Sequence, residues 1–368
     1  MQLVQTERAA LLPPLSATVG VVERRHTLPI LSNLLIENKA GALTLLATDL
    51  ELQIRTQVPN PGASEDFAIT VAARKLFDIV RALPEAATVK LDSKDSQVVV
   101  SAGKSRFTLQ TLPAADFPRM ETGAGVGDSV TLPQKTLKRL LQLVQFAMAS
   151  QDIRYYLNGM LLVTDGTQLR VVATDGHRLA YAEADIATPV AAREVIVPRK
   201  TVMELSKLLA DSDDTVELSI GSNQITVRLA DTELVSKVID GKFPDYQRVI
   251  PQNQPRHLVA NRAGVVAALQ RAAILSNEKF RGVRLVMNPG ALGIVCNNNE
   301  QEEAQDEIEV QYDGDTLDVG FNVSYLLDGL GAIGGETVMF SLADANSSML
   351  VSSAEAPGFK YVVMPMRI

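Results

Sequence analysis

One string in the sequence has residue types and spacing that could support hydrolysis. Asp175 and His177 are two residues apart, so on a β-strand they would share a face. The acid could then orient the imidazole as a general base toward a serine that the fold brings close. No GxSxG or other nucleophile motif accompanies the pair. A turn with a surface histidine is therefore the favoured interpretation, and a hydrolase is the alternative.

Two glycine-containing strings imitate nucleotide-binding motifs. Gly103-Lys104-Ser105 looks like the end of a phosphate loop, but such a loop needs glycine where Val98 stands, and the string joins two expected strands. Gly123, Gly125 and Gly127 imitate a dinucleotide fingerprint without a strand before them or a helix directly after them. We interpret the first as a hairpin turn and the second as a linker, and we expect no cofactor.

Composition excludes further classes of site. His26, His177 and His257 never occur at a metal-ligand spacing, and the single cysteine, Cys296, excludes an internal disulfide. The 368 residues are 46% hydrophobic and contain neither a signal peptide nor an apolar run long enough to cross a membrane. We expect a cytoplasmic protein with no metal site and roughly two or three domains.

The chain ends close to the string Met364-Pro365-Met366. Methionine side chains fill irregular cores, and they also line apolar surfaces that adapt to several partners. The residues by themselves leave a core position and a docking surface equally open.

The chain repeats one pattern three times. The string Thr48-Asp49 recurs as Thr174-Asp175 at an offset of 126 residues, with neighbouring landmarks at the same spacing. A fainter copy relates residues 159–174 to residues 282–297 at an offset of 123. Internal similarity of this kind predicts tandem domains. Their expected ranges are 1–121, 129–250 and 256–368.

Each copy shows the same order of elements. In the second copy, apolar residues at helical spacing over 137–144 predict an opening helix. Strands over 160–164 and 169–173 flank the turn signal Asp165-Gly166, and a second helix begins after Pro198. Alternating strands close the copy. The expected fold class is α+β, with two helices packed against antiparallel sheets in each of three tandem domains.

The formal net charge of −8 hides an uneven distribution. Six expected helix windows carry +10 together, so the other residues carry −18. Ordinary solvation of helices also produces such a bias. If the helices share one face, that face is positive and suits a phosphate backbone that is bound without sequence preference. The windows are 7–25, 72–83, 133–149, 198–210, 261–281 and 321–332.

Tandem sheet domains leave an unpaired sheet edge at each end of the chain. Such edges aggregate unless something covers them. A head-to-tail contact between the first domain of one chain and the last domain of another covers both edges, and it closes into a ring where the rotation permits. Two chains would then place their domains around a hole.

Strings along the whole chain match those of one known family. They are TLPIL at 27–31, TDLE at 48–51, LPAADFP at 112–118, YYLNGM at 155–160, ATDGHRL at 173–179, KFPDY at 242–246, SNEKFRGVRL at 276–285 and YVVMPMR at 361–367. In these strings, and in its three repeats, the chain resembles the bacterial DNA polymerase III beta subunits, the sliding clamps.

The resemblance implies a non-catalytic homodimer that forms a closed ring of clamp domains around double-stranded DNA, whatever its sequence. The ring would tether the replicative polymerase alpha subunit, and an ATP-dependent clamp loader would open and close it. These and other clamp-motif proteins would dock a short peptide into a pocket between the second and third domains.

Carried over residue by residue, the resemblance places the residues of this peptide pocket in three stretches of the chain, within 157–179, 244–249 and 346–367. The positions are Leu157, Thr174, Gly176, His177, Arg178, Leu179, Pro244, Arg248, Val249, Asn346, Ser348, Val362, Met364, Pro365, Met366 and Arg367. Two residues depart from the family pattern: Asn346 stands where an apolar side chain is usual, and Ile368 replaces a terminal leucine.

The resemblance also implies DNA contacts and a dimer interface. Residues expected at DNA by resemblance are Arg25, Gln151, Tyr155 and Tyr156, and by charge Arg74, Lys75, Arg199 and Lys200. Leu76, Ile79, Phe107 and Leu109 of one chain would face Ile274 and Leu275 of the other, with Arg106 opposite the acidic run from Glu300 to Glu303. A scaffold that binds no DNA is a further alternative, and salt-dependent DNA association through the helix cations would exclude it.

Overall fold

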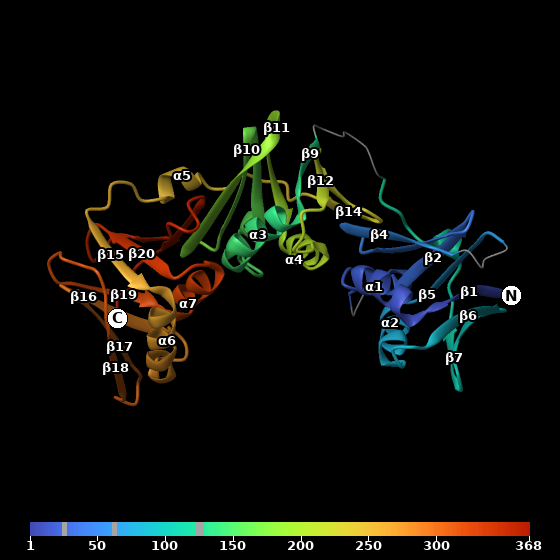
Figure 1. Ribbon diagram of the computed structural model, residues 1–368, viewed down its shortest axis with the longest axis horizontal. Coiled ribbons are helices and arrows are strands. Elements are labelled where there is room, and N and C mark those ends of the chain that lie inside the picture. The colour runs from blue at the N-terminus through green and yellow to red at the C-terminus, as the bar shows by residue number, and fades with distance from the viewer. Residues whose placement is uncertain (24–27, 61–64, 122–128) are drawn as a thin grey trace. The chain divides into compact units, whose positions relative to one another are not determined.

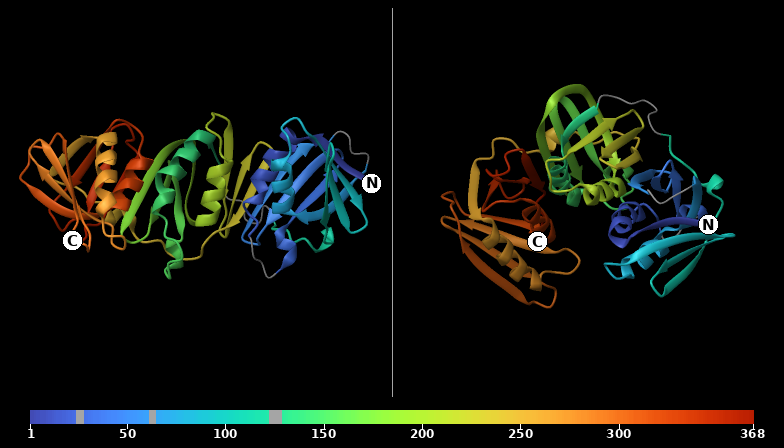
Figure 2. Two further views of the ribbon diagram at one scale, coloured as in Figure 1. Left: turned by 90° about the horizontal axis from the view of Figure 1, so that it is seen from below. Right: turned by 45° about the vertical axis from the view of Figure 1, so that its right-hand side comes forward.

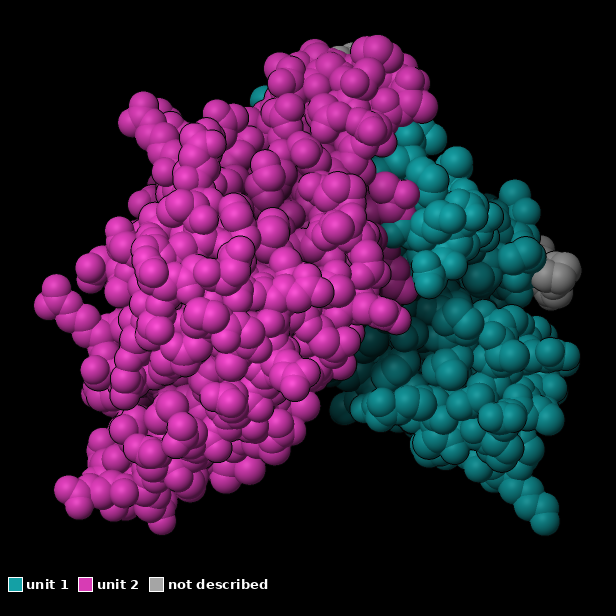
Figure 3. Space-filling view, turned by 60° about the vertical axis from the view of Figure 1, so that its left-hand side comes forward, with its two compact units in different colours: residues 1–135, 203–238 teal, residues 136–202, 239–368 magenta. Residues whose placement is uncertain are grey.

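The structure is a computed structural model that describes residues 1–23, 28–60, 65–121 and 129–368 (Figure 1). Arg25, His26 and the three linker glycines of the sequence analysis lie outside these ranges. The chain divides into two compact units (Figure 3). Unit 1 comprises Met1–Lys135 and Met203–Val238, and unit 2 comprises Thr136–Val202 and Ile239–Ile368.

Unit 1 contains an eight-stranded antiparallel sheet in the order β5-β2-β3-β4-β14-β13-β12-β9. Its strands come from two of the predicted copies, because β4 pairs with β14 and so joins two four-stranded halves. The strands are β2 (Asn33–Lys39), β3 (Ala42–Thr48), β4 (Leu52–Pro59), β5 (Phe67–Ala72), β9 (Ser129–Pro133), β12 (Thr215–Ile220), β13 (Gln224–Leu229) and β14 (Thr232–Lys237).

A second, four-stranded sheet of unit 1 has the order β1-β6-β7-β8. Helices α1 (Arg8–Val19) and α2 (Ala73–Ala82) contact each other and pack on strands β2 to β5 (Figure 2). Strand β8 is an edge strand of this sheet. The four strands are β1 (Gln2–Glu7), β6 (Thr88–Lys94), β7 (Gln97–Ala102) and β8 (Ser105–Gln110).

Unit 2 repeats this arrangement with a six-stranded sheet in the order β10-β11-β22-β21-β20-β15. Here β11 pairs with β22, again joining strands from two predicted copies. Because the copies share sheets in this way, the compact units do not follow the three predicted ranges. The strands are β10 (Gly159–Thr174), β11 (Arg178–Pro198), β15 (Arg256–Asn261), β20 (Thr337–Leu342), β21 (Met349–Ser352) and β22 (Phe359–Val363).

The other sheet of unit 2 has the order β18-β17-β16-β19 and is covered by helix α6. Its strands are β16 (Gly282–Asn288), β17 (Ala291–Asn297), β18 (Glu303–Glu309) and β19 (Leu317–Asn322). The remaining helices are α3 (Gln134–Val144) and α4 (Arg199–Leu208), which run from one unit into the other, with α5 (Tyr246–Val249), α6 (Arg262–Ala272) and α7 (Val323–Ala332). All six predicted helix windows therefore contain a helix, and the antiparallel α+β fold class is confirmed.

The strand registers repeat as the sequence does. Asn33 pairs with Ala72, and Gly159 pairs with Pro198, 126 residues further on for both partners. The predicted Asp165-Gly166 turn lies within β10, where pairing moves from one half of β11 to the other and Gly166 has φ +61°. Its counterpart 126 residues earlier, Ala40, has φ +50° in the turn between β2 and β3.

The core is aliphatic, with few aromatic side chains. Cys296 lies inside β17, and its burial raises the pKa of the thiol to about 11. The described ranges hold no group of three His, Cys, Asp or Glu side chains that could bind a metal ion. None of their helices is long and apolar enough to cross a bilayer.

Two glycines of α7 test the packing of this core. A Cβ on Gly329 would lie against the buried ring of Tyr361, whereas a Cβ on Gly331 would meet nothing within 4 Å. We expect Gly329→Ala to lower the free energy of unfolding by about 1–3 kcal/mol through overpacking. Gly331→Ala should raise it by up to about 0.5 kcal/mol through helix propensity. Urea unfolding with hydrogen exchange in α7 measures both, and equal effects would contradict this packing.

Candidate functional site

The Thr174–Arg178 segment is a tight turn built by its own side chains. Thr174 Oγ1 donates to the carbonyl of Arg178 at 2.6 Å and accepts from the amide of Gly176 at 3.1 Å. Asp175 Oδ1 accepts from the amides of His177 and Arg178 at 2.9 and 3.1 Å. Asp and Thr side chains commonly satisfy backbone amides in this way. The turn thus fixes the end of β10 to the start of β11.

The first copy builds the same turn. Thr48 Oγ1 donates to the carbonyl of Leu52 and accepts from the amide of Leu50, both at 3.0 Å. Asp49 Oδ1 accepts from the amides of Glu51 and Leu52. Leu50 holds φ +77° where the second copy has Gly176 at φ +90°. The recurrence shows that the Thr-Asp pair is a structural element of the repeat.

The hydrolase alternative fails on this geometry. Both oxygens of Asp175 are taken, Oδ1 by two backbone amides and Oδ2 by the Arg178 side chain at 3.0 Å. The His177 ring instead stacks on Tyr325 with ring centres 6.5 Å apart. Among the described residues, no hydrogen bond links the His177 imidazole to this carboxylate, so the geometry supports the favoured interpretation of a turn over the alternative of an Asp–His dyad.

Arg178 connects the turn to the last predicted copy. Its guanidinium donates to Asp175 Oδ2, to Asp328 Oδ2 at 2.6 Å and to the carbonyl of Phe146 at 2.7 Å. It also lies 4.4 Å from the centre of the Tyr325 ring, and its side chain is only 10% exposed. Buried charges are tolerated when paired and hydrogen-bonded in this way. Arg178 therefore holds the turn against α7.

Beside this turn lies a cavity of about 230 Å³ within unit 2. Its walls are mainly apolar, with the Arg154 guanidinium and the Thr174 hydroxyl as polar groups, which is typical of a site for an apolar peptide or small molecule. The lining residues are Arg154, Tyr156, Leu157, Thr174, Gly176, Arg178, Leu179, Pro244, Val249, Val362 and Met364. The structure thus brings nine of the predicted pocket residues together.

The other predicted pocket residues are not among those that line the cavity. The carbonyl of His177 accepts from the Met364 amide at 3.0 Å. Arg248 is exposed and paired with Asp245 at 2.9 Å, and the Ser348 carbonyl accepts from Gln254. The Asn346 amide donates to Asp344, in a turn, and Pro365, Met366 and Arg367 continue from Met364 to the end of the chain.

Two lining residues were not predicted for the pocket. Arg154 is held by Asp152, whose pKa its hydrogen bond lowers to about 2, and it donates to the carbonyl of Asp175. Tyr156 was predicted at DNA, and the structure places it in the wall of the cavity. Its neighbour Tyr155, also predicted at DNA, stays exposed and meets it edge to face. The only sequence signal was that Tyr156 adjoins Leu157.

The residues predicted at DNA lie in different surroundings. Arg74 donates to the carbonyl of Val22 at 2.6 Å, and Arg199 donates to the carbonyl of Met148 at 2.9 Å. Lys75 is exposed on α2, beside a cavity of about 600 Å³ that Arg74 and Arg81 also line. Gln151 is exposed with φ +58°, and Lys200 lies in the first turn of α4.

The residues predicted at the dimer interface lie on or near two edge strands. In unit 1, Arg106 is exposed and Phe107 is 38% exposed on β8, while Leu109 is buried. On α2, Leu76 is fully buried and Ile79 is partly buried, so Leu76 packs inside unit 1.

The unit 2 residues of the predicted interface lie next to edge strand β18. Ile274 is 78% exposed and Leu275 is partly buried. Glu300 and Glu303 are exposed, with Glu303 opening β18 itself.

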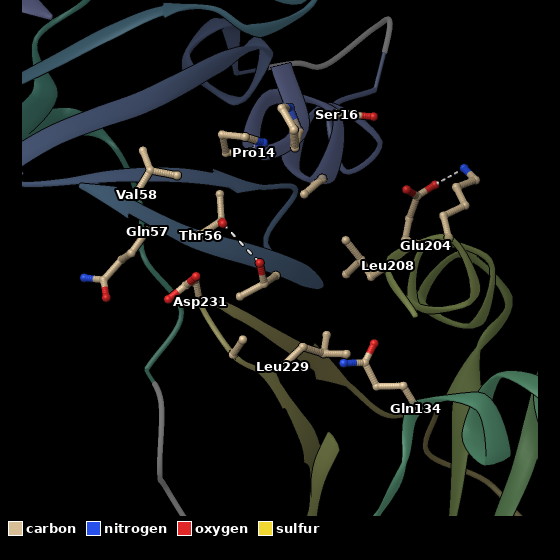
Figure 4. Close-up of a pocket in the computed structure, with 15 residues that line it drawn as sticks. Pro14, Ser16, Thr56, Gln57, Val58, Gln134, Glu204, Leu208, Leu229 and Asp231 are labelled. Carbon is tan, nitrogen blue, oxygen red and sulfur yellow. Dashed lines mark hydrogen bonds and ion pairs between the residues drawn. The ribbon is translucent and has the colours of Figure 1, made fainter. Parts of the chain in front are cut away.

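Unit 1 holds a further cavity, of about 540 Å³, that was not predicted (Figure 4). At its margins Thr56 and Thr232 are hydrogen-bonded at 3.0 Å, and Glu204 is paired with Lys207 at 2.7 Å. Pro14 of α1 supplies apolar surface to this cavity.

Two glycines with left-handed backbone test the turn beside the smaller cavity. At Gly176 an added Cβ would lie 3.0 Å from both terminal nitrogens of Arg154, whereas at Gly166 it would meet nothing within 4 Å. We expect Gly166→Ala to destabilise by about 1 kcal/mol through backbone strain. Gly176→Ala should cost about 2 kcal/mol, because Arg154 must also move. Urea unfolding and exchange of the His177 and Arg178 amides measure this, and equal costs would refute it.

Family models match the chain in three parts. These are the N-terminal, central and C-terminal domains of the DNA polymerase III beta subunit, over residues 1–121, 131–245 and 247–367. The beta sliding clamp of Pseudomonas aeruginosa is 49% identical over 363 residues, and that of Escherichia coli K12 is 48% identical over 362. Each alignment covers 98% of this chain and 99% of the relative.

Solved structures agree with this assignment. The sliding clamp of Pseudomonas aeruginosa bound to griselimycin has a TM-score of 0.95 at 48% identity, and that of Bartonella birtlesii bound to griselimycin has 0.93 at 37%. Both matches cover the whole of this chain and of the other. The predicted resemblance is confirmed: the chain belongs to the DNA polymerase III beta subunits, the bacterial sliding clamps, which are non-catalytic subunits of that polymerase.

Proposed function

We propose that this chain is the processivity clamp of a bacterial replicative polymerase, acting as a homodimeric ring around double-stranded DNA. The observation that carries the proposal is the match to sliding clamps over all three domains and nearly the whole length. Its work is topological: the ring holds the polymerase on its template without making or breaking a bond. We place this function in the cytoplasm.

The proposed ring closes through edge strands β8 and β18. Head to tail, β8 of one protomer lies beside β18 of its partner, so that two four-stranded sheets continue into one. Within the chain, the β4–β14 pairing already joins two such halves into eight strands. At the closed interface Phe107 meets Ile274, and Arg106 faces Glu300 and Glu303. The exposure of these side chains in the single chain supports this pairing.

DNA occupies the ring without sequence readout. The helix-borne cations Lys75, Lys200 and Arg199, with Arg74 and Tyr155, supply nonspecific contacts to phosphates, and Arg25 is a further candidate outside the described residues. Contacts of this kind fix position along the backbone and carry no sequence information. They also weaken steeply with salt, because binding releases counterions.

Partner proteins dock a short apolar peptide in the cavity beside the Thr174–Arg178 turn. The polymerase alpha subunit, the clamp loader and other clamp-motif proteins use this one site in turn. The mainly apolar lining, with the Arg154 side chain among it, supports this assignment. Because two related clamps carry griselimycin in their crystals, we propose that this chain binds griselimycin in the same cavity.

Topological binding has a direct test on circular DNA. After loading by an ATP-dependent clamp loader, the protein should stay on a closed circle in high salt, because escape requires the ring to open. Cutting the circle once should release it rapidly through the free ends. Gel filtration of labelled protein before and after cutting measures retention. Unchanged retention on cut DNA would refute the topological mechanism, and unloaded protein on the same circle is the control.

The cavity has a test of its own in Met364, which lines it and is 42% exposed. Met364→Asp puts a carboxylate in an apolar wall, and we expect griselimycin affinity to fall at least about tenfold from the cost of desolvating it. Leu28→Asp in unit 1, where Leu28 is 50% exposed and lines none of this cavity, is the matched control. Calorimetric titration measures both. Equal affinities for the two variants would contradict the site.

A further inference from the structure

Residues 364–368 are hydrogen-bonded to the Thr174–Arg178 turn and to strand β19. We call them the C-terminal tail. At its start the Met364 amide donates to the carbonyl of His177 at 3.0 Å. Further on the Met366 amide donates to the carbonyl of Gly320, on edge strand β19, at 2.8 Å. Between these bonds the tail has no regular secondary structure, so these contacts decide its path.

Two glycines make room for the terminal residue. The side chain of Ile368 lies 3.2 Å from the point that a Cβ on Gly282 would occupy, and 2.8 Å from that on Gly320. A Cβ on Gly320 would also run into the carbonyl oxygen of Met366. Neither glycine has a positive φ, so the backbone does not demand them. These two positions provide space for the tail. We call Gly282 and Gly320 together the glycine seat.

The other copies show what the glycine seat replaces. In the strand registers, Thr70 and Ile196 stand where the third copy has Gly320. In both copies a later segment of the chain forms a hydrogen bond at this position. The Leu112 amide donates to the hydroxyl of Thr70, and the Ile239 amide donates to the carbonyl of Ile196.

In these two copies the chain then continues to a buried phenylalanine. Phe117 packs on Leu35 and Leu46, and Phe243 belongs to the core cluster that includes Leu161 and Val172. In the third copy, the Ile368 side chain on the glycine seat supplies an apolar contact for this segment.

We infer that Ile368 is a positioning residue for the peptide cavity: by seating on Gly282 and Gly320 it fixes the tail and keeps Met364 in the cavity wall. The inference rests on the proposed function of that cavity. Ile368 remains 59% exposed, so one side holds the seat and the other faces solvent. A tail fixed before binding spares the peptide the entropy cost of ordering it.

The test changes either side of the contact. Gly320→Ala fills the seat, and Ile368→Gly removes the side chain without touching the sheet. We expect both to speed exchange of the Met366 amide at least about tenfold in the free protein, because its bond opens locally. Both should weaken griselimycin binding about fivefold, since binding must now order the tail. Neither residue lines the cavity, so a direct contact is not removed.

Gly293→Ala on β17 is the matched control, because its added Cβ would make an ordinary 3.4 Å contact with Val286 and none with the tail. It should leave exchange and affinity unchanged. Faster exchange with unchanged affinity would overturn the positioning role, and unchanged exchange would overturn the seat. If the unmodified chain fails to bind griselimycin, the proposed function of the cavity is wrong. The hydrogen-exchange data would still test whether the glycine seat holds the tail.

Discussion

The structure depends on one constraint, which is that the backbone N–H and C=O groups at a sheet edge need a hydrogen-bond partner or some other protection. Within the chain this is met twice, where β4 pairs with β14 and where β11 pairs with β22. These two pairings turn sheets of separate copies into sheets of eight and six strands. They also fix where surfaces from different copies meet, so the cavity proposed for peptides lies where it does because β22 joins β11 beside the Thr174–Arg178 turn.

The two junctions share their backbone and differ in their side chains. At the first, the Lys237 amide donates to the carbonyl of Glu51 at 2.9 Å, and the two side chains form an ion pair. At the second, the equivalent bond runs from Met364 to His177. Leu179 lies in the cavity wall, and the residue at the same register position of the first copy is Gln53. The side-chain oxygen of Gln53 accepts a hydrogen bond from the backbone amide of Met120. The backbone bond therefore recurs at both junctions, and at the second junction apolar side chains such as Leu179 line a cavity.

The sequence predicts what is local and misses what depends on contact between copies. Repeats, helices and the Thr-Asp turn follow from spacing, because hydrogen bonds within a few residues build them. The joined sheets leave no local signal, since their partners lie over 150 residues apart. Arg154 was not predicted in the cavity wall, because its contact with the Asp175 carbonyl joins residues that are 21 positions apart and shows no local pattern. A count of charges does not show that the guanidinium groups of Arg74 and Arg199 donate hydrogen bonds to backbone carbonyls. Nor does the resemblance reveal that Leu76 is fully buried.

The remaining edges carry charge that decides how they can pair. Strand β18 holds Glu303, Asp306, Glu307 and Glu309 and no basic residue, so two copies of it placed side by side would repel each other. Arg271 neutralises Asp306 within the chain, which leaves the other acids facing outward. Strand β8 carries Arg106 and follows Lys104. In the proposed ring the pairing of β8 with β18 brings opposite signs together, whereas pairing of like edges is opposed. In the proposed ring, head-to-tail closure is then selected by charge as well as by shape. The acidity of the chain by itself argues against DNA binding, yet the acidic residues of β18 favour the ring that is proposed to surround DNA.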